Sequence, residues 1–192
     1  TVGSSVYRLL QEGRQEIARR LGATLEIVAV AVRDPRKARA VPIPEALLRD
    51  SPEAVVNDPE VDLVVELMGG TEPARALVEL ALRSRKPVVT ANKALLAEHG
   101  GELFELCDRR KTEIAFEAAV GGAVPIIRTL RLSLAADRIT KLVAIINGTT
   151  NFILSAMERG LSFEEAVAEA QRLGFAEADP SMDVGGYDET LL

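Results

Sequence analysis

The feature that most constrains the fold is a regular alternation of short apolar runs with amphipathic segments. The apolar runs are rich in β-branched residues and occupy residues 25–32 (LEIVAVAV), 61–70 (VDLVVELMGG), 86–90 (KPVVT) and 112–116 (TEIAF). Runs of this kind are typical of strands covered on both faces. The segments between them space their apolar residues as helices do. This alternation, joined by short loops, predicts a doubly wound parallel α/β sheet.

Helices are expected at the opening of the chain, after Ser51-Pro52-Glu53, and over residues 72–85. Ser51 is a good capping residue, and proline is favoured at the first helical position. Residues 91–110 (ANKALLAEHGGELFELCDRR) also have a helical pattern. We expect the glycine pair at 100–101 to interrupt that helix.

Beyond Phe116 the pattern changes, which indicates a domain boundary near residues 117–125. A Gly-Gly turn precedes a helix that starts near Pro125. Residues 138–148 (RITKLVAIING) predict a long strand. Two helices are expected at 151–160 and 162–174, the second capped by Ser162 with acidic residues in its first turn.

Composition argues against several classes of protein. A net charge of -6 disfavours a general nucleic-acid binder, which would carry a basic face. The single cysteine, Cys107, excludes an intrachain disulfide and argues against a cysteine-based zinc site; its helical context predicts a packed small side chain. There is neither an apolar run of membrane-spanning length nor a signal-peptide pattern. The expectation is a cytoplasmic protein without a membrane or nucleic-acid partner.

The two ends of the sequence suggest an incomplete chain. It begins without Met at TVGSS, already within a helical pattern, and it stops at Leu192 without a stop signal. Gly3 could be the last glycine of a dinucleotide-binding turn, whose helix amides hold a pyrophosphate. A glycine that only allows close helix packing explains Gly3 equally well.

Arg33 follows the run at residues 25–32, at the position where dinucleotide-binding folds recognise the ribose. An acidic residue there favours the free hydroxyls of NAD, whereas arginine suits the 2′-phosphate of NADP. Arg33 therefore tilts the expectation toward NADP. An ordinary solvated loop residue is an equally good interpretation of Arg33 alone.

Two motifs follow the ends of neighbouring predicted strands. ELMGG places Gly69 and Gly70 where a ligand would lie outside the strand ends, because glycine permits close approach of the backbone. VVTANKALL places Lys93 on the same rim, beside Thr90 and Asn92. A lysine there can bind a carboxylate or transfer a proton. A plain turn and a solvated lysine are the simpler alternatives.

The segment 175–192 (FAEADPSMDVGGYDETLL) carries five carboxylates and no cation. Its spacing does not fit a calcium-binding loop of the EF-hand type. Glu177 and Asp188 could bind the ammonium group of a small substrate, although a solvated acidic loop remains the alternative. His99, the only histidine, is expected at the surface rather than as a general base.

Taken in order, these motifs resemble the homoserine dehydrogenase family. The resemblance runs through TVG, VELMGG, VVTANKALLAEHG, FEAAVGGAVPIIRTL, INGTTNFIL and LGFAEADPSMDVGGYD, and so covers essentially the whole chain. It implies an NAD(P)-binding Rossmann-like domain over residues 1–123. Part of an α+β catalytic and dimerisation domain would follow over residues 124–192. The implied reaction is reduction of L-aspartate 4-semialdehyde to L-homoserine, on the route to threonine, methionine and isoleucine.

The resemblance also implies a role for each matching residue. Lys93 and Asp183 would be catalytic, Lys93 by contacting cofactor and substrate and by protonating the alkoxide that hydride transfer creates. Glu177 and Asp188 would hold the substrate's amino end. The implied cofactor site comprises Thr1, Val2, Gly3, Arg33, Gly69, Gly70, Thr90, Lys93 and Gly174. A monovalent cation, Na+, would be bound by Glu117 and the backbone carbonyls of Val120, Gly122 and Val124; a Gly-Gly hinge without an ion is the alternative. The implied assembly is a homodimer or a higher homo-oligomer.

One position departs from the family's pattern. A lysine four residues after the aspartate of G-x-D is the favoured proton donor, but Leu192 stands there. We therefore expect the 192-residue chain to be catalytically poor or inactive by itself. Two other interpretations stay open at this stage: a non-catalytic fragment that keeps the dimer surface, and another NAD(P)-dependent amino-acid or semialdehyde dehydrogenase.

Overall fold

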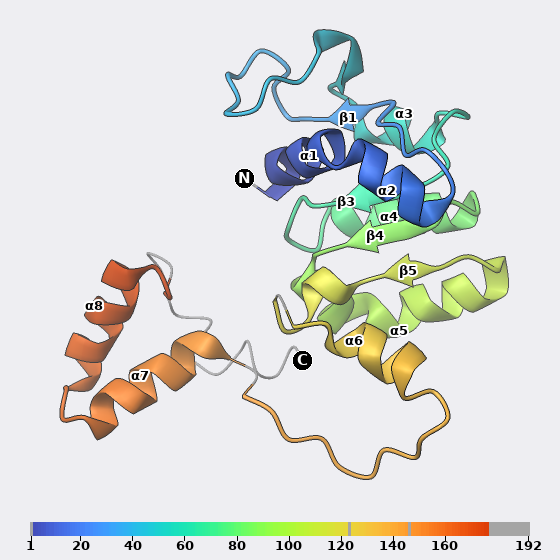
Figure 1. Cartoon of the computed structure of the whole chain (residues 1–192). Helices are drawn as coiled ribbons and strands as arrows, with labels where there is room; N and C mark the ends of the chain where they lie inside the picture. The colour runs from blue at the N-terminus through green and yellow to red at the C-terminus, as the bar shows by residue number, and fades with distance from the viewer. Residues whose placement is uncertain (1, 123, 146, 177–192) are drawn as a thin grey trace.

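Parallel strand pairs form at four of the predicted apolar runs in the computed structural model, which describes residues 2–122, 124–145 and 147–176 (Figure 1). Strand β3 (Val64–Glu66) pairs with β4 (Val88–Thr90), and β4 pairs with β5 (Ile114–Ala115), all in parallel. A second small parallel sheet joins β1 (Val30–Ala31) to β2 (Leu48–Arg49). The predicted α/β class with parallel strands is confirmed.

Helices lie on both sides of these strands. Figure 1 shows α1 (Val2–Glu12) and α2 (Arg14–Leu21) in front of the sheet, with α4 (Ala74–Arg83) and α5 (Lys93–Arg110) behind it. A 3-10 turn, η1 (Glu45–Leu47), precedes β2, and the short helix α3 (Pro52–Asn57) follows β2. Burial of apolar surface between α4, α5 and the strands is the main stabilising contribution here. The core consists of Val56, Ala74, Leu77, Val78, Ala81, Leu82, Val88, Leu95, Leu103, Leu106, Cys107 and Ile114.

Helix caps in this half follow the sequence. Ser51 caps α3 by accepting a hydrogen bond from the Ala54 amide at 3.1 Å, as expected. The expected interruption of α5 at its glycine pair is wrong, because the helix runs through Gly100 and Gly101 without a break. Gly100 is buried beneath Phe104, so the packing of α5 on the core outweighs the low helix propensity of glycine.

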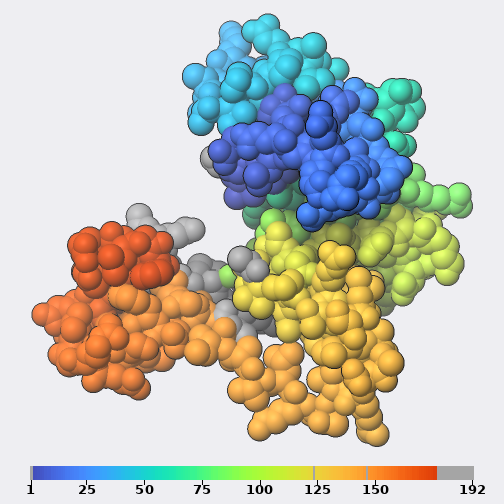
Figure 2. All heavy atoms as spheres, in the orientation of Figure 1, coloured from blue at the N-terminus to red at the C-terminus, as the bar shows by residue number. Residues whose placement is uncertain are grey.

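The second half of the chain contains short turns followed by a helical hairpin. The turns are η2 (Glu117–Ala119), α6 (Ile126–Arg128) and the π-helical η3 (Thr129–Ser133). Helices α7 (Gly148–Glu158) and α8 (Phe163–Leu173) then form where two helices were predicted, and they pack on each other. Ser162 caps α8 as predicted and forms a capping box with Glu165. Figure 2 shows this hairpin standing apart from the larger body formed by the preceding residues.

The long strand expected at residues 138–148 is wrong for the residues that the structure describes there. Residues 138–145 are irregular, and Gly148 already belongs to α7. Val143 and Ile145 are 80% and 74% exposed. Strands form where backbone groups find a partner strand and the side chains find a surface to pack on. No described segment pairs with residues 138–145, so their β-branched pattern has no sheet to join.

Over residues 2–122, 124–145 and 147–176, no helix combines the length and the apolar character required to cross a membrane.

Candidate functional site

The carboxyl ends of β3 and β4 form a rim at one edge of the three-stranded sheet. In open parallel sheets, ligands bind outside this edge. Gly69 and Gly70 follow β3 directly and are exposed, with φ of 77° and 74°. A side chain at either position would be strained, although a Cβ atom would meet nothing within 4 Å. The glycine pair therefore leaves this backbone uncovered toward solvent, which suits close approach of a cofactor.

A chain of hydrogen bonds, here called the rim network, joins this loop to the end of β4. The buried carboxylate of Glu66 accepts hydrogen bonds from the Met68 amide at 2.7 Å and from the Thr90 hydroxyl at 2.6 Å. The Thr90 hydroxyl in turn accepts from the Asn92 amide at 3.0 Å. The Asn92 side chain donates to the Gly70 carbonyl at 2.7 Å. The network thus ties the two predicted motifs, ELMGG and TANK, into one unit.

Lys93 is the first residue of α5 and lies next to this network, half-buried. Asn92 caps the helix, because its side-chain oxygen accepts a hydrogen bond from the Leu95 amide at 3.1 Å. The amino-terminal end of an 18-residue helix carries a partial positive charge, to which Lys93 adds a full one. An anionic group on a cofactor or a developing alkoxide is therefore favoured at this point of the rim.

The structure brings some of the sequence-predicted residues together at the rim and leaves others apart. Gly69, Gly70, Thr90 and Lys93 meet there, but the Thr90 hydroxyl points into the rim network rather than outward. Val2 and Gly3 are exposed at the start of α1. Figure 1 shows that start on the same side of the molecule as the strand ends. Arg33 is exposed just after β1.

Glu117 lies in the loop that was predicted to bind a monovalent cation. Its carboxylate accepts hydrogen bonds from the backbone amides of Ile127, at 3.0 Å, and Arg128, at 2.8 Å. Gly121 and Gly122 make the expected turn, with φ of 67° and 61°. Both carboxylate oxygens of Glu117 thus hold the start of α6, and a cation would have to share them. Among the described residues, no three His, Cys, Asp or Glu side chains form a group that could hold a metal ion.

Several predicted residues fall outside the residues that the structure describes. They are Thr1, Glu177, Asp183, Asp188 and Leu192. Gly174 is described: it ends α8 in the left-handed conformation, with φ of 79°. His99 lies on α5 and is partly exposed. Its ring nitrogens Nε2 and Nδ1 lie 3.8 Å from a carboxylate oxygen of Glu98 and 4.0 Å from one of Glu102, respectively. Cys107 is buried, as predicted, and burial raises the pKa of its thiol.

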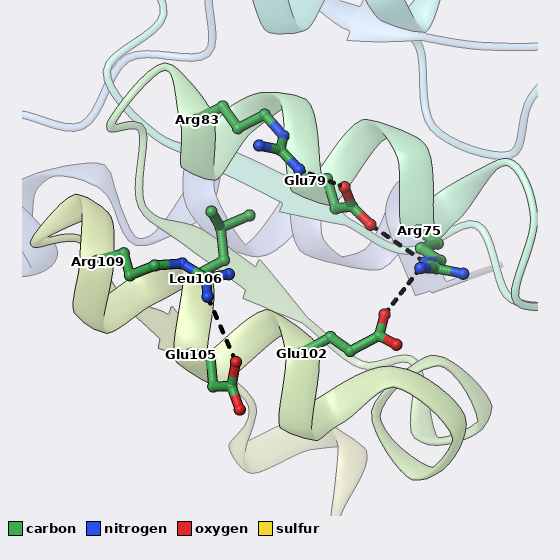
Figure 3. A pocket seen from close by; sticks show the side chains of 7 residues that line it. All are labelled: Arg75, Glu79, Arg83, Glu102, Glu105, Leu106 and Arg109. Atoms are coloured by element: carbon green, nitrogen blue, oxygen red, sulfur yellow. Dashed lines mark hydrogen bonds and ion pairs between the residues drawn. The ribbon is translucent and has the colours of Figure 1, made fainter.

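A hollow of about 240 Å³ lies away from the rim, between α4 and α5 (Figure 3). Charged side chains of alternating sign line it. Arg75 bridges Glu79 at 3.1 Å and Glu102 at 2.7 Å, and Arg109 pairs with Glu105 at 3.4 Å. These charges neutralise one another, so the hollow presents no net charge to a ligand. The ion pair between Arg75 and Glu102 joins the two helices.

Sequence reasoning missed one member of the rim network, Glu66. The detectable signal was a single acidic residue inside an otherwise apolar strand pattern, because such a residue is rarely buried without a specific partner. The sequence places Thr90 and Asn92 beside Lys93, and the family resemblance adds Thr90 to the implied cofactor site, but neither indicates which residues they bond to. Their actual partners, Glu66 and Gly70, lie more than 20 residues earlier in the sequence.

Comparisons with known proteins decide the family. Residues 1–117 match the family model for the NAD binding domain of homoserine dehydrogenase, and residues 125–191 match the model for homoserine dehydrogenase. The chain belongs to the homoserine dehydrogenase family. The homoserine dehydrogenase of Synechocystis is 47% identical over 98% of this chain, and that of Bacillus subtilis is 46% identical over 98%. The chain spans 43% and 44% of the length of these relatives.

Solved structures of homoserine dehydrogenases share the fold. A crystal structure from Thiobacillus denitrificans superposes with a TM-score of 0.87 and 48% identity, over 98% of this chain and 44% of its own. A hyperthermophilic archaeal homoserine dehydrogenase in complex with NADPH superposes with a TM-score of 0.66 and 34% identity, over 73% of this chain and 44% of its own. The predicted family resemblance is confirmed, and so is the Rossmann-like character of the first half.

Proposed function

We propose that the protein carrying this chain is an NAD(P)H-dependent reductase of L-aspartate 4-semialdehyde that produces L-homoserine. The observation that carries the proposal is the rim, where the uncovered Gly69–Gly70 backbone and Lys93 meet at the strand ends of a family member. The backbone can approach a nucleotide there, and the lysine supplies positive charge beside it.

The nucleotide site extends from the rim to the amino-terminal end of α1. Gly69 and Gly70 would hold the nicotinamide ribose, and Thr1, Val2 and Gly3 would hold the pyrophosphate. Thr90 contributes by bonding to Glu66 and Asn92, and Gly174 would complete the cofactor site. The archaeal relative in complex with NADPH supports a reduced nicotinamide nucleotide as the cofactor. The residues present fit such a group, because the rim is uncovered and carries a cation.

Arg33 makes NADP the favoured form of the cofactor. It is exposed and therefore accessible to a 2′-phosphate. In the complete enzyme, Arg33→Ala should raise the Michaelis constant for NADPH by about tenfold, the effect of losing one charge-assisted contact, and leave that for NADH nearly unchanged. Equal effects on both nucleotides would show that Arg33 does not recognise the phosphate.

When bound, a reduced nicotinamide nucleotide would supply the hydride that reduces the aldehyde carbon. Lys93 stabilises the alkoxide that develops on the former carbonyl oxygen and donates a proton to it. Its place at the amino-terminal end of α5 strengthens this stabilisation, because the helix adds partial positive charge. Glu177 and Asp188 would bind the ammonium group of the substrate, and Asp183 would act at the reacting carbonyl. Fixing both ends of the substrate keeps the reacting atoms in line.

Two further components belong to the proposal. Na+ would be held in the loop of residues 117–124 by Glu117, which would share its oxygens with the α6 amides, and by the carbonyls of Val120, Gly122 and Val124. The positive-φ turn at Gly121–Gly122 supports a loop that gathers carbonyl oxygens. The protein is a cytoplasmic homodimer or larger homo-oligomer. Exposed apolar side chains at residues 142–145 support association with another surface.

The test is to measure NADPH oxidation with L-aspartate 4-semialdehyde, using the 192-residue chain and the complete reading frame that encodes it. We expect the complete protein to consume NADPH only when the semialdehyde is present, and to form L-homoserine in equal amount. A Lys93→Met variant should lose about a hundredfold or more of the turnover rate, consistent with loss of a general acid. Oxidation of NADPH without L-homoserine as the product would refute the proposal.

A further inference from the structure

Glu66 is an unusual residue for its position. It is the last residue of β3, it lies opposite Thr90 in the register of the parallel pair, and it is only 4% exposed. Burying a carboxylate is costly unless its oxygens receive hydrogen bonds. Both oxygens do: one receives the Met68 amide and the other receives the Thr90 hydroxyl. The contacts of Glu66 therefore cross from the loop after β3 to the neighbouring strand.

The contacts continue until they close a ring. Thr90 connects Glu66 to the Asn92 amide, and the Asn92 side chain returns to the carbonyl of Gly70, in the loop where Met68 lies. Thr90 and Asn92 are 1% and 5% exposed, so the bonds from Thr90 to Glu66 and from the Asn92 amide to Thr90 are shielded from water. The chain from residue 66 to 70 and the chain from residue 90 to 92 are thus fixed against each other by side chains.

We propose that Glu66 is a positioning residue: through Thr90 and Asn92 it holds the Gly69–Gly70 loop at a set distance from Lys93. The inference rests on the proposed function, since that loop and Lys93 are the two groups assigned to cofactor and substrate. Glu66 itself contacts neither. A carboxylate suits the task because both of its neighbours here are donors; glutamine would bring an amide donor against one of them.

The first test uses hydrogen exchange and needs no cofactor. Glu66→Gln in the 192-residue chain should speed exchange of the Met68 amide and, across the network, of the Asn92 and Leu95 amides, each by about tenfold, as expected for the loss of one buried charged hydrogen bond. The matched control is Glu113→Gln, which changes an exposed glutamate beside the same sheet and should alter none of these rates. Faster exchange at residues 67–70 alone, with residues 91–95 still protected, overturns the proposal.

Thr90 offers a second pair of variants that keeps the proposal testable if Glu66→Gln fails to fold. Thr90→Val keeps the shape of the side chain and removes the hydroxyl, whereas Thr90→Ser keeps the hydroxyl. The valine variant should loosen both segments as Glu66→Gln does, and the serine variant should restore protection of both. Equal exchange in the two variants shows that side-chain packing, not the network, holds the rim.

NADPH affinity then separates positioning from simple stability. Dissociation constants are measured by fluorescence titration, at a temperature at which every variant is folded. Glu66→Gln and Thr90→Val should weaken NADPH binding by about tenfold, and Thr90→Ser and Glu113→Gln by less than about twofold. Unchanged affinity in the first two variants overturns the positioning role. If the unaltered chain does not bind NADPH, the proposed cofactor site fails, whereas the exchange experiment still decides the role of Glu66.

Discussion

Residues 86–90 and residues 138–145 are both rich in β-branched residues, and they differ in structure. Only the first segment contains a strand, β4, which pairs with a neighbour on each side. The second is irregular and exposes Val143 and Ile145. The difference shows that a segment forms a strand only where a neighbouring strand is available to pair with it. A β-branched run supplies suitable side chains, and a partner strand must supply the hydrogen bonds.

The same contrast holds between the two parts of the chain as a whole. Around β3, β4 and β5, apolar side chains of α4 and α5 are fully buried in one continuous core. The hairpin of α7 and α8 has a small core made mainly of alanines, with Ile153 as its one large, fully buried side chain among the described residues. Because stabilisation scales with buried apolar area, we expect the first part to dominate the stability of the chain.

The largest loss of stability should come from truncating a side chain in the core around β3, β4 and β5. Leu82→Ala should lower the free energy of unfolding by about 3 kcal/mol, because Leu82 is fully buried and the change leaves a cavity. Leu142→Ala, at a position 55% exposed in the irregular segment, is the matched control and should cost less than about 0.5 kcal/mol. Urea denaturation followed by circular dichroism measures both. Similar costs would mean that residues 138–145 are packed in solution.

Removing a helix cap should cost less stability than truncating the core, and the cost should be larger in the first part of the chain than in the hairpin. Asn92→Ala removes the cap of α5 and also the hydrogen bond from the buried Asn92 side chain to the Gly70 carbonyl, so we expect a loss of about 2 kcal/mol. Ser162→Ala removes an exposed capping box on α8 and should cost about 1 kcal/mol. Both are read from the same denaturation curves. A larger cost for Ser162→Ala would reverse the ranking of the two parts.

The smallest effect concerns acid sensitivity. The hydrogen bond from Arg83, with a second from Arg75, lowers the pKa of Glu79 below its ordinary value near 4.5. The ionised form is therefore favoured by folding, and its stabilisation is present above that pH and is lost as the pH falls through the lowered pKa. Glu79→Gln should cost about 0.5 kcal/mol at neutral pH and nothing in strong acid.

Glu169→Gln provides the control in the hairpin. Arg172 lowers the pKa of Glu169 in the same direction, but that pair is at the surface of α8 and is screened by solvent. Its effect on stability should be smaller than that of Glu79→Gln at neutral pH, and both effects should vanish in strong acid. Denaturation midpoints measured from acid to neutral pH test both variants, and an equal pH dependence would contradict the comparison.

Much of the first half could be predicted from sequence, for identifiable reasons. The strands at 64–66, 88–90 and 114–115 lie inside the predicted apolar runs, and Gly69, Gly70 and Lys93 follow two of them closely enough to locate the rim. What could not be predicted depended on distant contacts. The continuous α5 requires the packing of Phe104 over Gly100, and the rim network requires Glu66 and Thr90 to be opposite each other.

The two hydrogen bonds of Glu117 determine which residues can act as a pivot. They connect Glu117, just after β5, to the start of α6 across the Gly121–Gly122 turn. These bonds restrain the turn, so we expect α6 to keep a fixed position relative to the sheet. We therefore expect any swing of the α7–α8 hairpin relative to the rim to arise downstream of η3 and not at the Gly121–Gly122 turn. Spectroscopic distance labels on α6 and α7 would report that swing, whereas labels on α5 and α6 would keep a constant separation.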